Sequence, residues 1–266
     1  MKNIRVLYFI LVASMLVLTA CEPIIDEIGL TDTTNVEGVQ LVAANSPAGG
    51  NKVKLSMVTP GITGYWDVGT GKVLSNEATL VLPYTGKHTL TYVGKLGVSF
   101  FTKTIDVTVD RLDTPLDPMY YKLAGSNPAA GKDWVLDNQG GVDKKWFFMS
   151  PANDISKALQ VLVNYGAFAP PSDVDGKMNF NCAGGLNCNY YKSRTGNAVR
   201  GQFILDIARK RLTCFGGNPA GSILGGEKGS PDGIYNIISI TDTELVLYDA
   251  LNREDGAGFT FVYKAL

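Results

Sequence analysis

Two short aromatic segments carry the residues best suited to binding chemistry. They are "KKWFF" (144–148) and "NCNYYK" (187–192), in which rings stand beside lysine and asparagine. A flat ring can stack on the C–H groups of a sugar, while amides and charged groups bind the sugar hydroxyls. The sequence therefore predicts a glycan-binding surface that uses the side chains of Trp146, Phe148, Tyr190 and Tyr191.

Packing is the alternative role for these rings. Successive residues of a β-strand point to opposite faces of a sheet, so neighbours such as Tyr190 and Tyr191 cannot both be buried on one side. A β-bulge, a core on both faces of the sheet or an edge packed against a helix would bury such rings without any ligand. The sequence leaves both interpretations open.

Catalytic chemistry has little support. A glycoside hydrolase places two carboxylic acids across a cleft, whereas the acids of the second half show no such spacing and are interpreted as solvated turn residues. The one histidine, His88, excludes any mechanism that needs two histidines. Phosphate-binding loops, nucleophile elbows and metalloprotease motifs are absent from the sequence. We therefore predict no catalytic residue, no metal site and no cofactor.

Three cysteines of the second half leave two interpretations open. One disulfide could form, either locally between Cys182 and Cys188 or across strands from one of these to Cys214. All three could instead be small buried thiols in strands. A zinc site is not expected, because the spacing of Cys182 and Cys188 is poor for one and no histidine is near.

The fourth cysteine, Cys21, has a different setting. A short basic segment and an apolar run (6–18) precede it, and the run is shorter than the ~20 residues of a membrane-spanning helix but suits a signal peptide. The segment "LTAC" (18–21) resembles the lipobox of bacterial lipoproteins, which is a leucine, two small residues and a cysteine. This resemblance implies removal of residues 1–20 and lipid attachment to Cys21.

Residues 21–36 are predicted to form a flexible acidic tether, since they contain several acids and no basic residue. The stretch resembles the acidic segment that directs Bacteroidetes lipoproteins to the outer face of the outer membrane. The resemblance implies a protein that is lipid-anchored in the outer membrane and faces the cell exterior. A formal net charge of −1 offers no basic surface for nucleic acid.

The elements that position these residues are predicted to be strands, because short alternating runs are bounded by many of the 30 glycines. The alternation predicts a β-sandwich over 37–111, with Trp66 in its core and His88 solvated or hydrogen-bonded. The segment "YWDVGTGKVLS" and the hairpin and strand that follow it resemble bacterial PKD-like modules of immunoglobulin fold. The resemblance implies a spacer domain.

A linker at 112–118 and a second antiparallel β domain at 119–266 are expected to follow. Trp134 in an opening strand, the hairpin 235–247 and the final strand with Phe259 and Phe261 resemble the lipocalin-like domains of Bacteroidetes lipoproteins. The resemblance implies an antiparallel barrel, with a β-sandwich or jelly roll as the alternative. One short helix is predicted within 150–162, from Ser150 and Pro151 followed by apolar residues at helical spacing.

These observations favour a cell-envelope lipoprotein, exposed on the outer membrane, that binds a glycan or another nutrient ligand without catalysis. A structural or adhesive envelope protein without a small ligand is the second hypothesis, and a glycoside hydrolase is the third. The expected partners are the membrane, through the lipid anchor, a polysaccharide and an outer-membrane nutrient-uptake complex, whereas nucleic acid is not expected.

Overall fold

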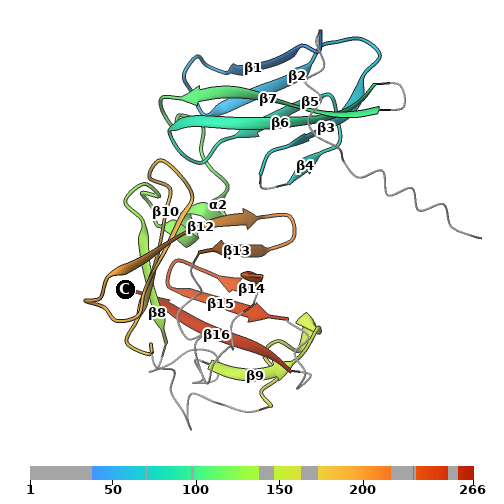
Figure 1. The fold of residues 1–266 in the computed structure, drawn as a ribbon. Coiled ribbons are helices and arrows are strands. Elements are labelled where there is room, and N and C mark those ends of the chain that lie inside the picture. The colour runs from blue at the N-terminus through green and yellow to red at the C-terminus, as the bar shows by residue number, and fades with distance from the viewer. Residues whose placement is uncertain are drawn as a thin grey trace, which may run out of the picture. The chain divides into compact units, whose positions relative to one another are not determined.

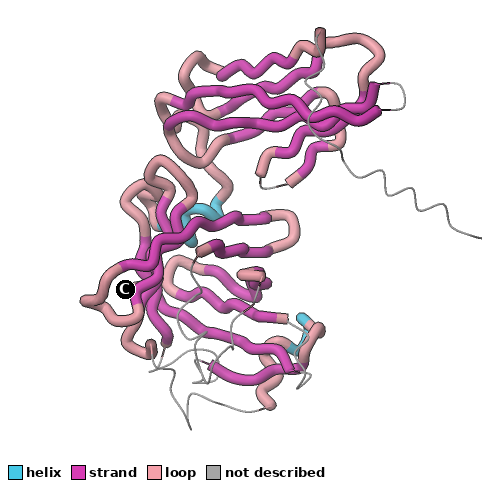
Figure 2. Tube along the Cα trace, in the orientation of Figure 1, coloured by secondary structure: helices cyan, strands magenta, loops and turns pink. Residues whose placement is uncertain are grey.

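A computed structural model describes residues 38–69, 71–96, 99–137, 147–162, 173–216, 230, 232–250 and 257–266. Cys21, the predicted signal peptide and tether, and Trp146 lie outside these residues. The described chain is built almost wholly from strands, with one short α-helix and one 3-10 turn (Figure 2). None of its helices is long and apolar enough to cross a membrane.

The first part of the chain forms two antiparallel sheets that face each other (Figure 1). One sheet has the order β1-β2-β5, and its strands are β1 (Leu41–Asn45), β2 (Lys52–Met57) and β5 (Glu77–Val81). The other has the order β4-β3-β6-β7, and its strands are β3 (Thr63–Asp67), β4 (Lys72–Val73), β6 (Gly86–Leu96) and β7 (Ser99–Val109). Trp66 is fully buried between the sheets, as predicted, and its indole donates to the Asn76 carbonyl at 3.1 Å.

The chain enters and leaves this sandwich at opposite ends. At the entry, the backbone N–H of Gln40 donates to the Thr59 hydroxyl, and Lys103 of β7 donates to the Val39 carbonyl. The end of β6 at Leu96 and the start of β7 at Ser99, which pair with each other, therefore lie at this same end. We call it the tether end. At the exit, the N–H groups of Asp110 and Arg111 both donate to the carbonyl of Gly49, in the β1–β2 turn.

The second part is a closed antiparallel barrel (Figure 1). Its eight strands follow the order β15-β14-β13-β12-β11-β10-β8-β16, and pairing of β15 with β16 closes the ring. The strands are β8 (Lys132–Leu136), β10 (Lys177–Asn181), β11 (Asn187–Tyr191), β12 (Ala198–Asp206), β13 (Arg211–Phe215), β14 (Ile234–Ile240), β15 (Glu244–Asp249) and β16 (Ala257–Ala265). The predicted class, all-β with an immunoglobulin-like sandwich followed by a barrel, is confirmed.

Aromatic side chains fill the described barrel interior, because alternate residues of each strand point inward. Phe259, Phe261 and Tyr263 of β16 are fully buried there, as is Trp134 of β8. The helix α2 (Pro118–Ala124) also contributes to this core, and its Leu123 carbonyl accepts a 2.8 Å hydrogen bond from the Trp134 indole. Asp117 caps the helix and Pro118 begins it.

The helix predicted within 150–162 was wrong. Ser150 and Pro151 belong to strand β9 (Phe147–Pro151), which pairs with the first half of β16, and one 3-10 turn at Ile155–Lys157 follows. The hydroxyl of Ser150 is buried and lies 2.8 Å from that of Thr260. Pairing with β16 satisfies the backbone at Ser150 and Pro151. The predicted helix start is therefore part of a strand, and only one 3-10 turn forms in the segment with helical spacing.

Candidate functional site

The structure separates the predicted ring set. Phe148 is fully buried in a small cluster with Val246 and Val262, on the outer side of β15 and β16. Such a ring leaves no face free for a sugar, so the burial of Phe148 supports the packing alternative over the predicted ligand contact. Trp146 lies outside the described residues, and its role stays a prediction.

Tyr190 points into the barrel. It is 6% exposed, and its hydroxyl donates to the Oδ2 of Asp173, itself fully buried, at 2.8 Å. Burial raises the pKa of Tyr190, and the hydrogen bond to the Asp173 carboxylate raises it further. This ring is committed to the interior of the barrel, so the structure supports packing rather than stacking on a sugar.

Tyr191, the next residue, lies on the outer face of the barrel and is half-buried. The ammonium of Lys177, its partner in register on β10, sits 4.9 Å from the centre of the ring. The same Lys177 Nζ lies 2.7 Å from Asp133 Oδ2 on β8. Tyr191 is thus the one ring among the described members of the predicted set that lies on the surface, and it has charged neighbours.

Asparagines extend this surface across three strands. The Asn187 amide donates to Asn181 Oδ1 at 2.8 Å, Asn181 donates to Asn179 Oδ1 at 2.8 Å, and Asn179 donates to Asp133 Oδ1 at 2.7 Å. We call Asp133, Lys177, Asn179, Asn181 and Asn187 the polar ladder. All five are half-buried, and their mutual hydrogen bonds fix the side chains in one arrangement before any ligand arrives.

The ladder keeps unused hydrogen-bonding capacity at Asp133 and Asn179. A carboxamide has two N–H donors and two acceptor lone pairs, and Asn179 uses one of each within the ladder. Each carboxylate oxygen of Asp133 accepts one side-chain hydrogen bond, although it can accept more. A sugar hydroxyl both donates and accepts, so it can use the free positions on both residues.

A groove borders these two residues. It has a volume of about 530 Å³ and is lined by Asp133 and Asn179 together with polar groups of the loop before β8, including Ser126 and Asn127. Gly131 brings this loop close to the ladder, since it has φ +84° and a Cβ there would lie 2.8 Å from that of Asn181. Substitution of Gly131 would therefore push the loop away from the ladder.

Lys132 forms part of the same groove. Its ammonium donates to the carbonyls of Lys122 and Asp242, at 2.6 and 3.0 Å, and lies 5.0 Å from the Trp134 ring centre. Burial lowers the pKa of Lys132. Since its donors bind backbone carbonyls, this lysine holds the groove wall in place.

Sequence reasoning missed most of the ladder. The signal was present in "KMNFN" and "NCNYY", where asparagines alternate with apolar residues and so share the outer face. The apolar residues between them, Met178 and Phe180, are both buried, as this alternation requires. Asp133 is one of the acids that the sequence interpretation treated as solvated turn residues, but it lies within β8 and is the acceptor on which the ladder ends.

The cysteines of the barrel are free and buried. The Cys188 thiol donates to the sulfur of Cys214, with 3.7 Å between the two Sγ atoms. This geometry agrees with the buried-thiol interpretation. Among the described residues, no cluster of three or more histidines, cysteines or acids could hold a metal ion.

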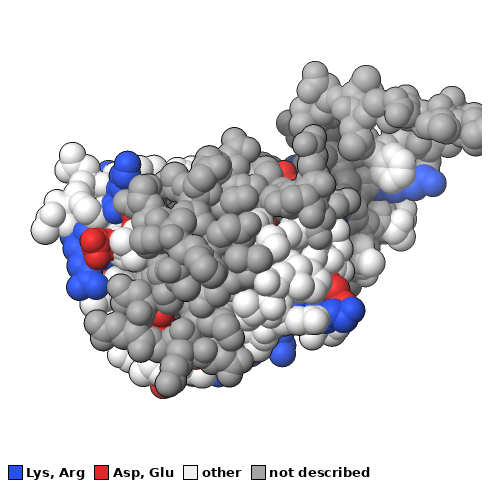
Figure 3. All heavy atoms as spheres, turned by 90° about the horizontal axis from the view of Figure 1, so that it is seen from below, with Lys and Arg blue, Asp and Glu red and all other residues white. Residues whose placement is uncertain are grey.

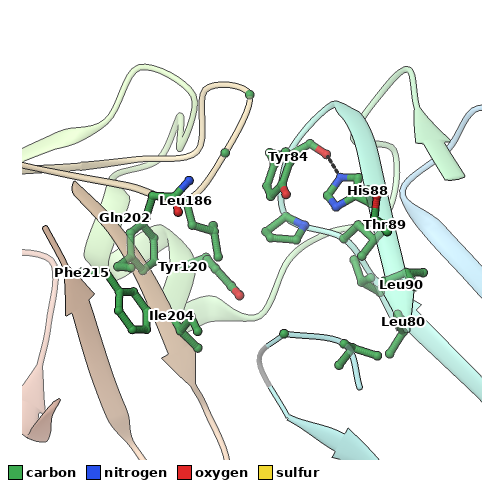
Figure 4. Close-up of a pocket in the computed structure, with 18 residues that line it drawn as sticks. Leu80, Tyr84, His88, Thr89, Leu90, Tyr120, Leu186, Gln202, Ile204 and Phe215 are labelled. Atoms are coloured by element: carbon green, nitrogen blue, oxygen red, sulfur yellow. Dashed lines mark hydrogen bonds between the residues drawn. The ribbon is translucent and has the colours of Figure 1, made fainter. Parts of the chain in front are cut away.

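His88 has a structural setting in the sandwich. Figure 4 shows its imidazole hydrogen-bonded to the carbonyl of Tyr84, with Nε2 and the oxygen 2.9 Å apart. The two rings also stack at 4.0 Å between centres. The predicted hydrogen-bonded histidine is therefore confirmed.

Surface charge and sequence comparison add little to the assignment. On the face drawn in Figure 3, Lys and Arg lie among Asp and Glu, and the described atoms form no broad area of one sign. A scan against models of protein families finds no match for this chain, and a search of curated proteins finds none either. The candidate function consequently depends on the geometry of the ladder.

Proposed function

We propose that the protein is a surface lipoprotein that binds a glycan, without catalysis, through the polar ladder and Tyr191. The observation that carries the proposal is the continuous array from Asn187 to Asp133, which retains free donors and acceptors where it meets the groove. Lys177 joins this array to the Tyr191 ring. Amides and a carboxylate beside a ring provide both of the contacts that a sugar needs.

The proposed address is the outer membrane, with the protein anchored by a lipid on Cys21 and facing the cell exterior. The lipobox-like "LTAC" and the acidic segment after it support this address. The sandwich serves as a PKD-like spacer and the barrel as the lipocalin-like binding domain of a nutrient-uptake complex. In cell fractionation, Cys21→Ala should move the protein out of the membrane fraction, and unchanged membrane retention would contradict the anchor.

Native gels cast with starch, xylan or laminarin test the binding proposal. At least one polysaccharide should retard the full mature chain, and Tyr191→Ala should weaken binding by about tenfold or more, as truncating an aromatic anchor does. Tyr65→Ala is the matched control, because Tyr65 in the sandwich carries Lys72 at 4.8 Å from its ring centre but has no ladder beside it. Equal effects of the two substitutions would refute the assigned surface.

A structural or adhesive role is the second candidate. The burial of Phe148 and Tyr190 favours it, because two of the rings predicted to bind sugar have packing roles. This candidate predicts that no polysaccharide retards the chain and that Tyr191→Ala changes nothing in the gels. The same gel series therefore decides between the two.

A further inference from the structure

Apolar side chains lie exposed at the tether end of the sandwich. Phe100 is 58% exposed and Leu96 is 46% exposed, on facing strands of the β6–β7 hairpin. Val58, just after β2, is 46% exposed, and Leu74 is 82% exposed. Asn76 ties the Leu74 segment to this end, since its amide donates to the Ile62 carbonyl at 2.8 Å and its own carbonyl accepts from Met57.

Basic groups accompany these apolar side chains. The ammonium of Lys95 lies 5.9 Å from the centre of the Phe100 ring. Lys103 donates to the carbonyl of Val39, where the chain enters the sandwich. Segments 56–66 and 91–105 contain no acid, and Glu77, opposite Ser56, is the nearest one in register. Aromatic and aliphatic residues bordered by lysines are typical of surfaces that meet the interfacial zone of a bilayer.

The length of chain before the sandwich brings this end close to the anchor. A segment as long as 21–37 spans at most about 55–60 Å, even when fully extended. An anchored sandwich would therefore experience a high local concentration of bilayer at its tether end, so even weak apolar contacts there become effective.

We infer that the tether end of the sandwich rests on the bilayer that holds the Cys21 lipid, with Phe100 and Leu96 in the interfacial zone and Lys95 at the level of the headgroups. This inference rests on the proposed anchor at Cys21 and adds a second, protein-mediated contact to it. The occupant of the apolar surface is thus the membrane itself.

Depth-dependent quenching tests this contact. The lipidated full chain with Phe100→Trp is reconstituted into phosphatidylethanolamine–phosphatidylglycerol vesicles whose acyl chains carry bromine, a quencher of tryptophan fluorescence. Val81→Trp is the matched control, since Val81 is also exposed, at 39%, but pairs with Lys52 near the exit end. With the unsubstituted chain as background, the tryptophan at 100 should lose most of its fluorescence and the one at 81 should keep it.

Three results would overturn the inference. Equal quenching at positions 100 and 81, or none at either, would show that the tether end is not the membrane-facing end. Sedimentation of a detergent-free Cys21→Ala chain as a dimer that Phe100→Ser dissociates would make the surface an interface between copies. An intact mass without lipid would remove the anchor and the inference together, whereas lipid present without selective quenching would remove the inference alone.

Discussion

The hydroxyl of Tyr190 offers the sharpest test of how strand β11 divides its two faces. Tyr190→Phe removes one oxygen and with it the 2.8 Å hydrogen bond to Asp173 Oδ2. Both residues are buried, and a hydrogen bond to a charged partner contributes roughly 1.5–3 kcal/mol. We expect the free energy of unfolding of the barrel to fall by about 2 kcal/mol, which lowers its melting temperature by roughly 4–8 °C.

Tyr191→Phe is the control, because it makes the same chemical change one residue along on the outer face. Surface changes of this kind stay within about 0.5 kcal/mol. Urea unfolding followed by tryptophan fluorescence is the assay, carried out in a Trp66→Phe background. The remaining tryptophans, Trp134 and Trp146, both belong to the second domain, so their signal reports the barrel.

We expect the two tyrosines to show opposite effects on stability and on glycan retention. Tyr190→Phe lowers stability and leaves glycan retention unchanged, whereas Tyr191→Ala lowers retention with little change in stability. A loss below about 0.5 kcal/mol for Tyr190→Phe would mean that the buried hydrogen bond is not made. Loss of glycan retention in Tyr190→Phe would mean that the ligand binds on the inner side of the strand, against the assignment made above.

Three further predictions concern other groups. Burial lowers the pKa of His88 below its usual value, and its hydrogen bond to Tyr84 opposes part of this effect. The unfolded chain therefore binds a proton more readily at this histidine than the folded chain does. The free energy of unfolding should fall as the pH drops below about 6.5 and through the folded pKa, by at most about 1.4 kcal/mol per pH unit. His88→Gln should reduce that slope in urea titrations between pH 5 and 7, and an identical slope would refute the assignment. Burial raises the pKa of Cys182 to about 12, and the neighbouring Cys188 thiol together with burial raises that of Cys214. In a Cys21→Ala chain, a thiol reagent at pH 8 should therefore label the folded state about a thousandfold more slowly than the unfolded state. Rapid labelling of the folded chain would contradict the buried-thiol arrangement. Trp146→Ala should reduce glycan retention without a large change in melting temperature, and a drop of many degrees would make Trp146 a packing residue instead.

The fold class could be read from the sequence because strand alternation is a local signal. Period-two spacing puts Met178 and Phe180 on one face of β10, and both side chains are buried in the barrel core. Barrel closure could not be read in this way. It depends on β8 pairing with both β10 and β16, and β16 lies more than a hundred residues further along the chain.

Misassigned helices show the same limit. Asp117 caps helix α2 and Pro118 is its first residue. Because a second proline lies close by, the sequence instead indicated a linker there, and α2 was not predicted. Ser150 and Pro151 are equally good start signals for a helix, yet they are the last two residues of β9. The difference is tertiary, since Ser150 bonds to Thr260 in a strand that sequence proximity does not reveal.

The candidate site could be predicted only in part, because its residues are brought together by pairing between distant strands. Alternation assigns each asparagine to an outer face, but it does not reveal that Asp133 stands in register with Asn179, 46 residues away. Without that acceptor, the three asparagines of the ladder look like separate polar positions. Because the Asp133 carboxylate can only accept, each asparagine amide donates toward it, from Asn187 to Asn181 to Asn179. The unused hydrogen-bonding groups of Asn179 and Asp133 are then at the groove.

The opposite ends of the sandwich link the two proposals physically. The chain enters near Gln40 and leaves near Arg111, and β6, with 11 residues, spans about 35 Å between these ends. If the tether end rests on the bilayer, the length of β6 sets how far above the bilayer the chain leaves the sandwich. A flexible tether alone would leave that height and the orientation free. Under the two proposals, the chain leaves the sandwich on the side away from the headgroups and continues from there into the glycan-binding domain.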